Sequence, residues 1–150
     1  MKSAPKGWPR ISSAVYYEEP RKAIDWLCKA FGFEVKLLVE GDDGLVHHSE
    51  LVYGEGMIMV SGVAEVSAHP EATHRKSPRS LGGANTQSMM VFVDDADAHC
   101  ARAREHGAKI IVAPKNSDYG EDYWEDRTYE AEDIEGHRWW FCQRLREPKS

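Results

Sequence analysis

The chain has 150 residues, of which 41% are hydrophobic and 29% are charged, and its formal net charge at pH 7 is −6. These values are typical of one globular domain that is long enough to bury a core. The acidic balance and the lack of a basic stripe argue against nucleic-acid binding, which needs clustered Lys and Arg. The longest apolar runs, residues 57–60 and 89–93, are too short to cross a bilayer.

The compartment is indicated by the cysteines and the first residues. Cys28, Cys100 and Cys142 are isolated and odd in number, which argues against a disulfide framework and against a zinc site. The opening MKSAPKGWPR has no apolar core of a signal peptide. We therefore expect a protein of the reducing cytoplasm, with no membrane partner.

The first half of the chain alternates strand and helix signals. Residues 10–17 are rich in β-branched and aromatic side chains and predict a strand. Pro20 suits the first turn of a helix, apolar residues follow at helical spacing as far as Phe31, and Gly32 suits the C-cap. Three further strands, divided by glycine-containing turns, are predicted at residues 34–40, 46–53 and 57–61.

The second half repeats this order. Residues 88–93 predict a strand, and Asp94 and Asp95 precede a helix over residues 96–106 that Gly107 closes. The remaining predicted strands are residues 108–112, 126–132 and 138–143, the last two forming a hairpin.

The repeated order indicates two supersecondary modules in one domain. A constant offset places Tyr17 on Phe92 and Gly32 on Gly107. Module one covers about residues 10–62 and module two about residues 87–145, and the Ser-, Pro- and Gly-rich stretch 63–86 links them. Each module would pack its helix on one sheet face and leave the other face available, which makes the fold class α+β.

A second long connection, residues 114–125, contains Tyr123 and Trp124. Aromatic side chains in a loop either line a pocket or pack locally, and both interpretations stay open here. We include Trp124 among the candidate ligand-binding residues.

Three segments carry a resemblance to a known family. They are residues 23–35, residues 91–108 and, most specifically, the ending RTYEAEDIEGHRWWF at residues 127–141. With them the chain resembles the vicinal oxygen chelate superfamily, in particular its short glyoxalase- and bleomycin-resistance-like members. The resemblance implies two βαβββ modules that form a curved mixed sheet with a cup-like cavity, and a homodimer. Residues 121–126 look like an insertion relative to those proteins.

The metal-dependent relatives take four ligands, usually His, Gln or Glu, from the first and fourth strands of each module. By the resemblance these positions fall at Ser12, Met59, Ser88 and Trp140. A divalent metal needs imidazole or carboxylate donors, which none of these four side chains provides. We therefore expect no metal site and no cofactor.

His48 and Glu50 are candidate catalytic residues. They alternate with Ser49 and Leu51, so both project from one face of the strand at residues 46–53. If Leu51 faces the helix, the pair faces the cavity, where Glu50 could hold the His48 ring for acid–base work. The alternative is that the two side chains simply meet solvent or each other on a half-exposed sheet.

Arg138 alternates onto one face with Trp140 and Cys142. In a cavity its guanidinium could bind a carboxylate or phosphate group. The alternative is an ion pair across the hairpin with Glu132 or Asp133. Cys142 would be reactive if Arg138 lowered its pKa, although a buried inert thiol is the simpler interpretation.

Apolar side chains on the predicted concave faces favour a small-molecule pocket over faces that close on themselves. We expect a metal-free binding protein that sequesters an aromatic or cationic compound as a homodimer. The alternative is a lyase or isomerase that uses His48 and Glu50. With Trp124 and Arg138, the candidate ligand-binding residues are Tyr16, Met57, Met59, Met90, Phe92 and Trp140.

Overall fold

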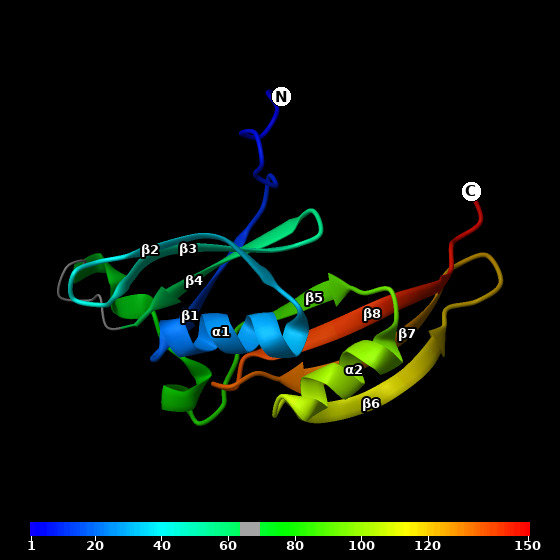
Figure 1. Ribbon diagram of the computed structural model, residues 1–150. Helices are drawn as coiled ribbons and strands as arrows, with labels where there is room; N and C mark the ends of the chain where they lie inside the picture. Colours follow the sequence, from blue (N-terminus) through cyan, green and yellow to red (C-terminus); the bar gives the residue numbers. More distant parts are fainter. Residues whose placement is uncertain (64–69) are drawn as a thin grey trace.

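The computed structural model describes residues 1–63 and 70–150, and residues 64–69 of the predicted linker lie outside the described residues. Two modules of the same element order follow each other along the chain (Figure 1). The first contains β1 (Ser13–Tyr17), α1 (Pro20–Phe31), β2 (Glu34–Glu40), β3 (Val46–Tyr53) and β4 (Gly56–Gly62). The second contains β5 (Ser88–Phe92), α2 (Ala96–Glu105), β6 (Lys109–Asp118), β7 (Glu125–Glu132) and β8 (Arg138–Arg146).

Each module forms its own four-stranded mixed sheet. Sheet one has the order β1-β4-β3-β2 and sheet two the order β5-β8-β7-β6. In both sheets the first pair is parallel and the other pairs are antiparallel. The predicted α+β class and the repeated βαβββ order are confirmed.

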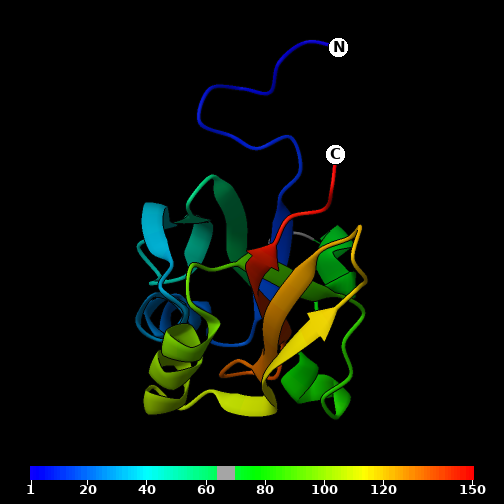
Figure 2. The same ribbon diagram turned by 90° about the vertical axis from the view of Figure 1, so that its right-hand side faces the viewer.

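Both helices lie on the same side of the sheets and contact each other, whereas the two short 3-10 helices of the linker, Pro70–His74 and Pro78–Leu81, lie on the other side (Figure 2). α1 begins at Pro20 and ends where Gly32 takes a left-handed backbone with φ 81° and bonds back to the carbonyl of Cys28. In α2 the Asp95 side chain accepts a hydrogen bond from the backbone N–H of Ala98, as an N-cap residue does. Among residues 1–63 and 70–150, no helix has the length and apolar character needed to span a membrane.

The predicted loop at residues 114–125 is wrong in its extent, because strands occupy half of it. β6 extends to Asp118 and pairs with β7, so that only residues 119–124 form the turn. The sequence did not predict this extension, because Pro114 interrupts the strand pattern. The structure tolerates Pro114 because β6 is an edge strand with register irregularities on both sides of Val112.

The two modules share one core through the end of α1. Phe31 is fully buried, and its ring centroid lies 5.4 Å from that of Trp139 and 4.7 Å from that of Phe141. Phe31 belongs to module one and its two partners to β8 of module two, so the modules are packed together rather than strung on a linker.

A buried carboxylate adds a polar connection between the modules. The Asp133 carboxylate accepts hydrogen bonds from the Tyr17 hydroxyl at 2.6 Å and from the Trp139 indole N–H at 3.0 Å. Burial and the adjacent Asp133 raise the pKa of Tyr17 well above its usual value, which keeps the phenol protonated as the donor. Asp133 therefore ties the β7–β8 turn to β1.

Glu135 in the same turn binds the start of α1. Its carboxylate accepts hydrogen bonds from the backbone N–H groups of Glu18 and Glu19 at 2.8 and 3.0 Å, and from the Ser77 hydroxyl at 2.6 Å. Because Glu19 offers no side-chain cap to its own helix, the carboxylate of Glu135 supplies the negative charge that a helix N-terminus favours.

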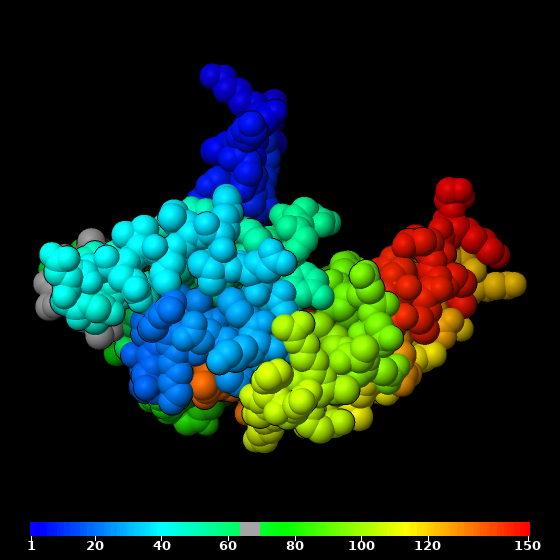
Figure 3. Space-filling view, viewed as in Figure 1, coloured from blue at the N-terminus to red at the C-terminus, as the bar shows by residue number. Residues whose placement is uncertain are grey.

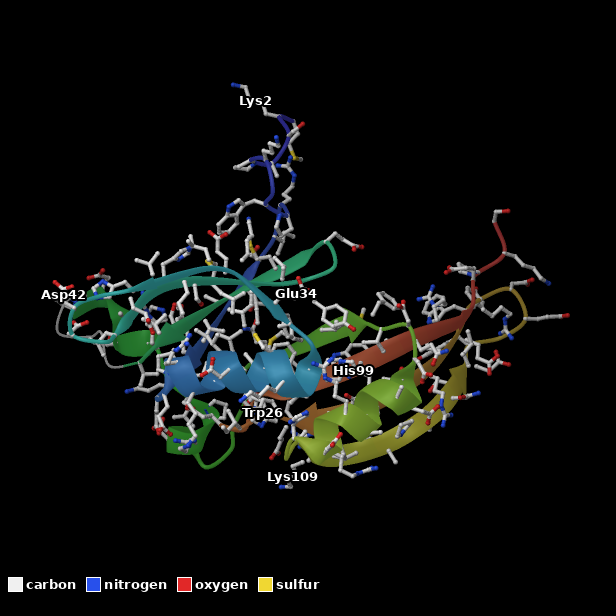
Figure 4. The ribbon with its side chains drawn as sticks, viewed as in Figure 1. Lys2, Trp26, Glu34, Asp42, His99 and Lys109 are labelled. Carbon is white, nitrogen blue, oxygen red and sulfur yellow. The ribbon has the colours of Figure 1, made fainter. Side chains whose placement is uncertain are left out.

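His99 lies where the end of α1 meets α2 (Figure 4) and makes stability depend on pH. Its Nε2–H donates to the Phe31 carbonyl at 2.8 Å, so Nδ1 accepts from the Tyr129 hydroxyl at 2.6 Å. Burial lowers the pKa of His99. Below about pH 6.5 the His99 ring is therefore protonated in the unfolded chain and still neutral in the folded chain. The free energy of unfolding is expected to fall as the pH drops through this range, by at most about 1.4 kcal/mol per pH unit.

Urea unfolding between neutral and mildly acidic pH measures this dependence. In His99→Gln the loss of stability between these pH values should be smaller than in the parent chain. His106→Gln, at an exposed position, is the matched control and should keep the parent's pH profile. An unchanged profile in His99→Gln would contradict the assignment.

Candidate functional site

The open face of sheet two is the surface of β5 and β8 that points away from the helices. Met90 and Phe92 on β5 and Trp140 on β8 project from it and are 42%, 50% and 39% exposed. They alternate with core residues, and Met90 pairs with Trp140 in the parallel register. Contiguous apolar groups on a surface usually mark a binding site.

Trp124 extends this face through a stacked arginine. The Arg144 guanidinium lies 5.3 Å from the centroid of the Phe92 ring and 5.7 Å from that of Trp124. Asp126 fixes Arg144 from the side with an ion pair of 2.6 Å. The Trp124 ring also lies 5.0 Å from that of Tyr119. Trp124 therefore packs locally and at the same time lengthens the aromatic surface.

Arg138 lies next to Trp140 but its charge is already paired. Its guanidinium forms ion pairs with Glu132 at 3.2 Å and with Glu130 at 3.7 Å. The partner across the hairpin is thus Glu132, as one of the two interpretations expected, and Asp133 is engaged elsewhere. A hollow of about 490 Å³ beside Arg138 and Trp140 leaves the guanidinium accessible.

Cys142 lies between these groups on β8 and is buried. Burial raises the pKa of its thiol, and the Thr128 hydroxyl lies 3.2 Å from the sulfur. A raised pKa leaves little thiolate at neutral pH, which favours the inert interpretation.

The inter-module cleft is a cavity with four boundaries. They are the β3–β4 turn, residues 11–13 at the start of β1, strand β5, and the end of β8. The volume of the cleft is about 1040 Å³, at the upper end of the range of small-molecule sites. In Figure 3 a broad notch separates the N-terminal segment and the β3–β4 turn from the C-terminal end of β8, with β5 at its base. Three predicted residues, Met57, Met90 and Phe92, line the cleft.

His48 and Glu50 meet on sheet one. His48 Nε2 lies 3.1 Å from one carboxylate oxygen of Glu50, and Lys36 Nζ lies 3.2 Å from the other. The hydrogen bond from His48 lowers the pKa of Glu50 against the opposing effect of its burial, and Lys36 lowers it further. With both oxygens engaged, Glu50 is suited to orient the His48 ring and poorly suited to accept a proton itself.

Tyr16 and Met59 lie apart from the open face of sheet two. The Tyr16 ring is covered by linker residues, with the His74 ring at 5.8 Å and the Arg75 guanidinium at 5.4 Å. Met59 is half-buried on β4 opposite Ala14. Within one chain the eight predicted ligand-binding residues are thus divided between the two modules, and Met57, Met90 and Phe92 come together at the inter-module cleft.

The four positions expected for metal ligands do not fit a divalent metal. Met59 and Trp140 lie on β4 and β8, Ser88 begins β5, and Ser12 directly precedes β1. A thioether, an indole and two hydroxyls are poor donors for such an ion. Within residues 1–63 and 70–150, no three His, Cys, Asp or Glu side chains gather where they could hold a metal.

The sequence did not single out several residues that shape the cleft: Phe33, Tyr53, Glu55, Asp94 and Gln143. Glu55 stands between two glycines in a turn, and Asp94 follows an apolar run. Each is an ordinary turn signal by itself. Only the packing of one module on the other brings the two turns to the same cavity.

Comparison with known proteins gives a family match and several relatives. The profile of the Glyoxalase/Bleomycin resistance protein/Dioxygenase superfamily matches residues 11–141. The uncharacterised protein Mb0911c of Mycobacterium bovis is 29% identical over 140 residues, which cover 93% of this chain and 86% of that protein. The uncharacterised protein Rv0887c of Mycobacterium tuberculosis is also 29% identical over 140 residues, 93% of this chain and 76% of its own length.

Solved structures agree on the fold. TioX from Micromonospora sp. ML1 superposes with a TM-score of 0.68 at 29% identity, covering 91% of this chain and 99% of TioX. TnmS3, described as an antibiotic binding protein from Streptomyces sp. CB03234, superposes with a TM-score of 0.61 at 19% identity, covering 89% of this chain and 93% of TnmS3. At the lower identity the likeness shows the fold alone.

Proposed function

Because the chain belongs to the Glyoxalase/Bleomycin resistance protein/Dioxygenase superfamily, we propose that it is a small-molecule binding protein that works without a metal and sequesters an aromatic or cationic compound. The observation that carries the proposal is the exposed apolar surface of Met90, Phe92 and Trp140 on the open face of sheet two. Such rings stack on planar ligands. The description of a fold neighbour as an antibiotic binding protein supports it.

The proposal includes a homodimer in the cytoplasm. In one chain the open face of sheet two is exposed, and a second copy that faces it would enclose the ligand pocket between the two chains and shield the apolar surface. The three cysteines are free, which suits a reducing compartment. Light scattering of the purified protein measures the oligomeric state directly.

Catalysis by His48 is the second candidate, and the observation that favours it is the 3.1 Å contact with Glu50. The pair lies on sheet one, away from the exposed rings of sheet two. Glu50 is held on its other side by Lys36 at 3.2 Å. In this alternative, a lyase or isomerase reaction, His48 would carry the proton and Glu50 would orient the ring.

The binding proposal is tested by screening aromatic and cationic antibiotics for stabilisation in thermal unfolding. A ligand at 100 times its dissociation constant should add about 2.7 kcal/mol. Trp140→Ala is expected to weaken binding by about tenfold, because one stacking partner is lost. Leu81→Ala, an apolar truncation at an exposed position of the linker, is the control and should bind like the parent.

Two outcomes would overturn the proposal. One is a panel in which no compound stabilises the protein. The other is turnover of a bound compound that His48→Asn abolishes, which would establish the enzyme instead. Elemental analysis of protein purified without chelators tests the metal-free part separately, since a stoichiometric metal would contradict it.

A further inference from the structure

The inter-module cleft has two lips that come from different modules. One lip is the β3–β4 turn, which carries Glu55, and the other is the connection from β5 to α2, which carries Asp94. Both carboxylates therefore border one cavity although they are far apart in the sequence.

The charges around the cleft do not cancel. Arg144 is the basic residue of its lining, and it is engaged by Asp126 at 2.6 Å and by Glu147 at 3.1 Å. Within the described part of the chain, Glu55 and Asp94 have neither an ion pair nor a hydrogen bond to their side chains. The lips thus hold two carboxylates that are not neutralised.

The field of Asp94 reaches into the cleft. Tyr53, which also lines the cleft, has a pKa that is raised first by burial and then by the negative charge of Asp94, against a smaller lowering effect of Arg102. Glu55 and Asp94 are both exposed, so salt screens their field and an attraction to a cation should weaken as the salt concentration rises.

The N-terminus of α2 also borders the cleft, but protein side chains already accept hydrogen bonds from two of its N–H donors. The Gln143 side-chain oxygen accepts from the backbone N–H of Ala96 at 3.0 Å, and Asp95 accepts from that of Ala98 at 2.9 Å. An anion in the cleft would find these donors taken and two free carboxylates beside it.

The floor of the cleft is apolar and aromatic. Phe33 and Met57 are buried at its base, and Phe92 borders the cleft with half of its surface exposed. Aromatic faces attract cations as well as apolar groups. The apolar part of a ligand could therefore pack on the floor of the cleft, while a positive charge on the same ligand could approach the two carboxylates.

We propose that Glu55 and Asp94 make the inter-module cleft selective for an organic cation, whose charge lies between the two lips and whose apolar body packs on Phe33, Met57 and Phe92. The proposal rests on the small-molecule binding function and names its ligand class. Because the lips belong to different modules, the bound cation also bridges them.

Fluorescence titration with berberine, a flat quaternary cation that keeps its charge at every pH, tests the proposal. Glu55→Gln combined with Asp94→Asn is expected to weaken berberine binding by about tenfold, because two partly screened ion pairs are lost. Raising the salt concentration should weaken binding to the parent more than to the double variant. Anilinonaphthalene sulfonate, an aromatic anion, should bind the double variant at least as well as the parent.

Asp42→Asn combined with Glu105→Gln is the matched control, since it removes the same charge from exposed positions outside the cleft. It should bind berberine like the parent. Equal weakening in both double variants would overturn the proposal, because net charge and not the cleft would then select the ligand. Unchanged binding in Glu55→Gln/Asp94→Asn, or no berberine binding by the parent, would also overturn it.

The failure of this proposal differs from failure of the binding function. If the parent binds neutral aromatic compounds, if Trp140→Ala weakens that binding, and if Glu55→Gln/Asp94→Asn has no effect, the proposed function stands and only the cation selectivity is overturned. A parent that binds none of the probes loses both.

Discussion

Asp133→Ala is expected to lower the free energy of unfolding by about 3–5 kcal/mol. The carboxylate is buried and accepts from the Tyr17 hydroxyl, the Trp139 indole and the backbone N–H groups of Glu135 and His137. Alanine leaves all four donors in the interior without an acceptor, and each unsatisfied buried donor is costly. Urea denaturation followed by tryptophan fluorescence measures the loss.

Two comparisons separate the network from the charge alone. Asp133→Asn keeps the shape and one acceptor oxygen, so it should lose less stability than Asp133→Ala. Asp42→Ala, in the exposed turn between β2 and β3, should stay within about 0.5 kcal/mol of the parent. A loss below about 1 kcal/mol in Asp133→Ala would show that water replaces the carboxylate and that the turn does not tie the modules together.

The sequence predicted those elements whose signals are local. The helical spacing of Ala23, Ile24, Leu27, Cys28 and Phe31 predicted α1. The structure buries all of these side chains except Cys28, which is half-buried. Gly32 marked the end of the helix because its left-handed backbone is accessible to glycine without strain. The repeat of element order was visible for the same reason, since each module forms its own sheet.

The sequence could not predict features that depend on neighbouring strands. β6 continues through Pro114 because β7 provides a partner as far as Asp118, which pairs with Glu125. The ending around Asp133 and Glu135 was recognised as a family feature. That its carboxylates bind Tyr17 and the start of α1 follows only from the packing of module two on module one.

The candidate site likewise contains some residues that local patterns predict and others that only the packing of the modules brings together. Strand alternation placed Met90, Phe92 and Trp140 on one face, because period-two patterns need only the local chain. That Glu55 and Asp94 border the same cleft could not be predicted, because no local pattern connects a glycine-flanked turn with the end of a strand in the other module. His48 and Glu50 could be paired from alternation, whereas Lys36, on the neighbouring strand, could not.

The end of α1 is where cooperativity between the modules is expected to arise. Phe31 touches the rings of Trp26 in its own helix and of Trp139 and Phe141 in sheet two. The Phe31 carbonyl also accepts the His99 ring N–H. Since one side chain fills the junction from the module-one side, its removal opens a cavity that both modules border.

Phe31→Ala is therefore expected to lower the free energy of unfolding by about 3–5 kcal/mol, the usual loss for a fully buried phenylalanine. Tyr119→Ala, an aromatic truncation at a position 54% exposed, should change it by less than about 1 kcal/mol. Combining Phe31→Ala with Phe141→Ala should cost less than the sum of the single losses, because the two side chains share one contact. If the two losses added fully, or if Phe31→Ala unfolded in two separate transitions while the parent unfolded in one, the rings would not couple the modules in the way their packing implies.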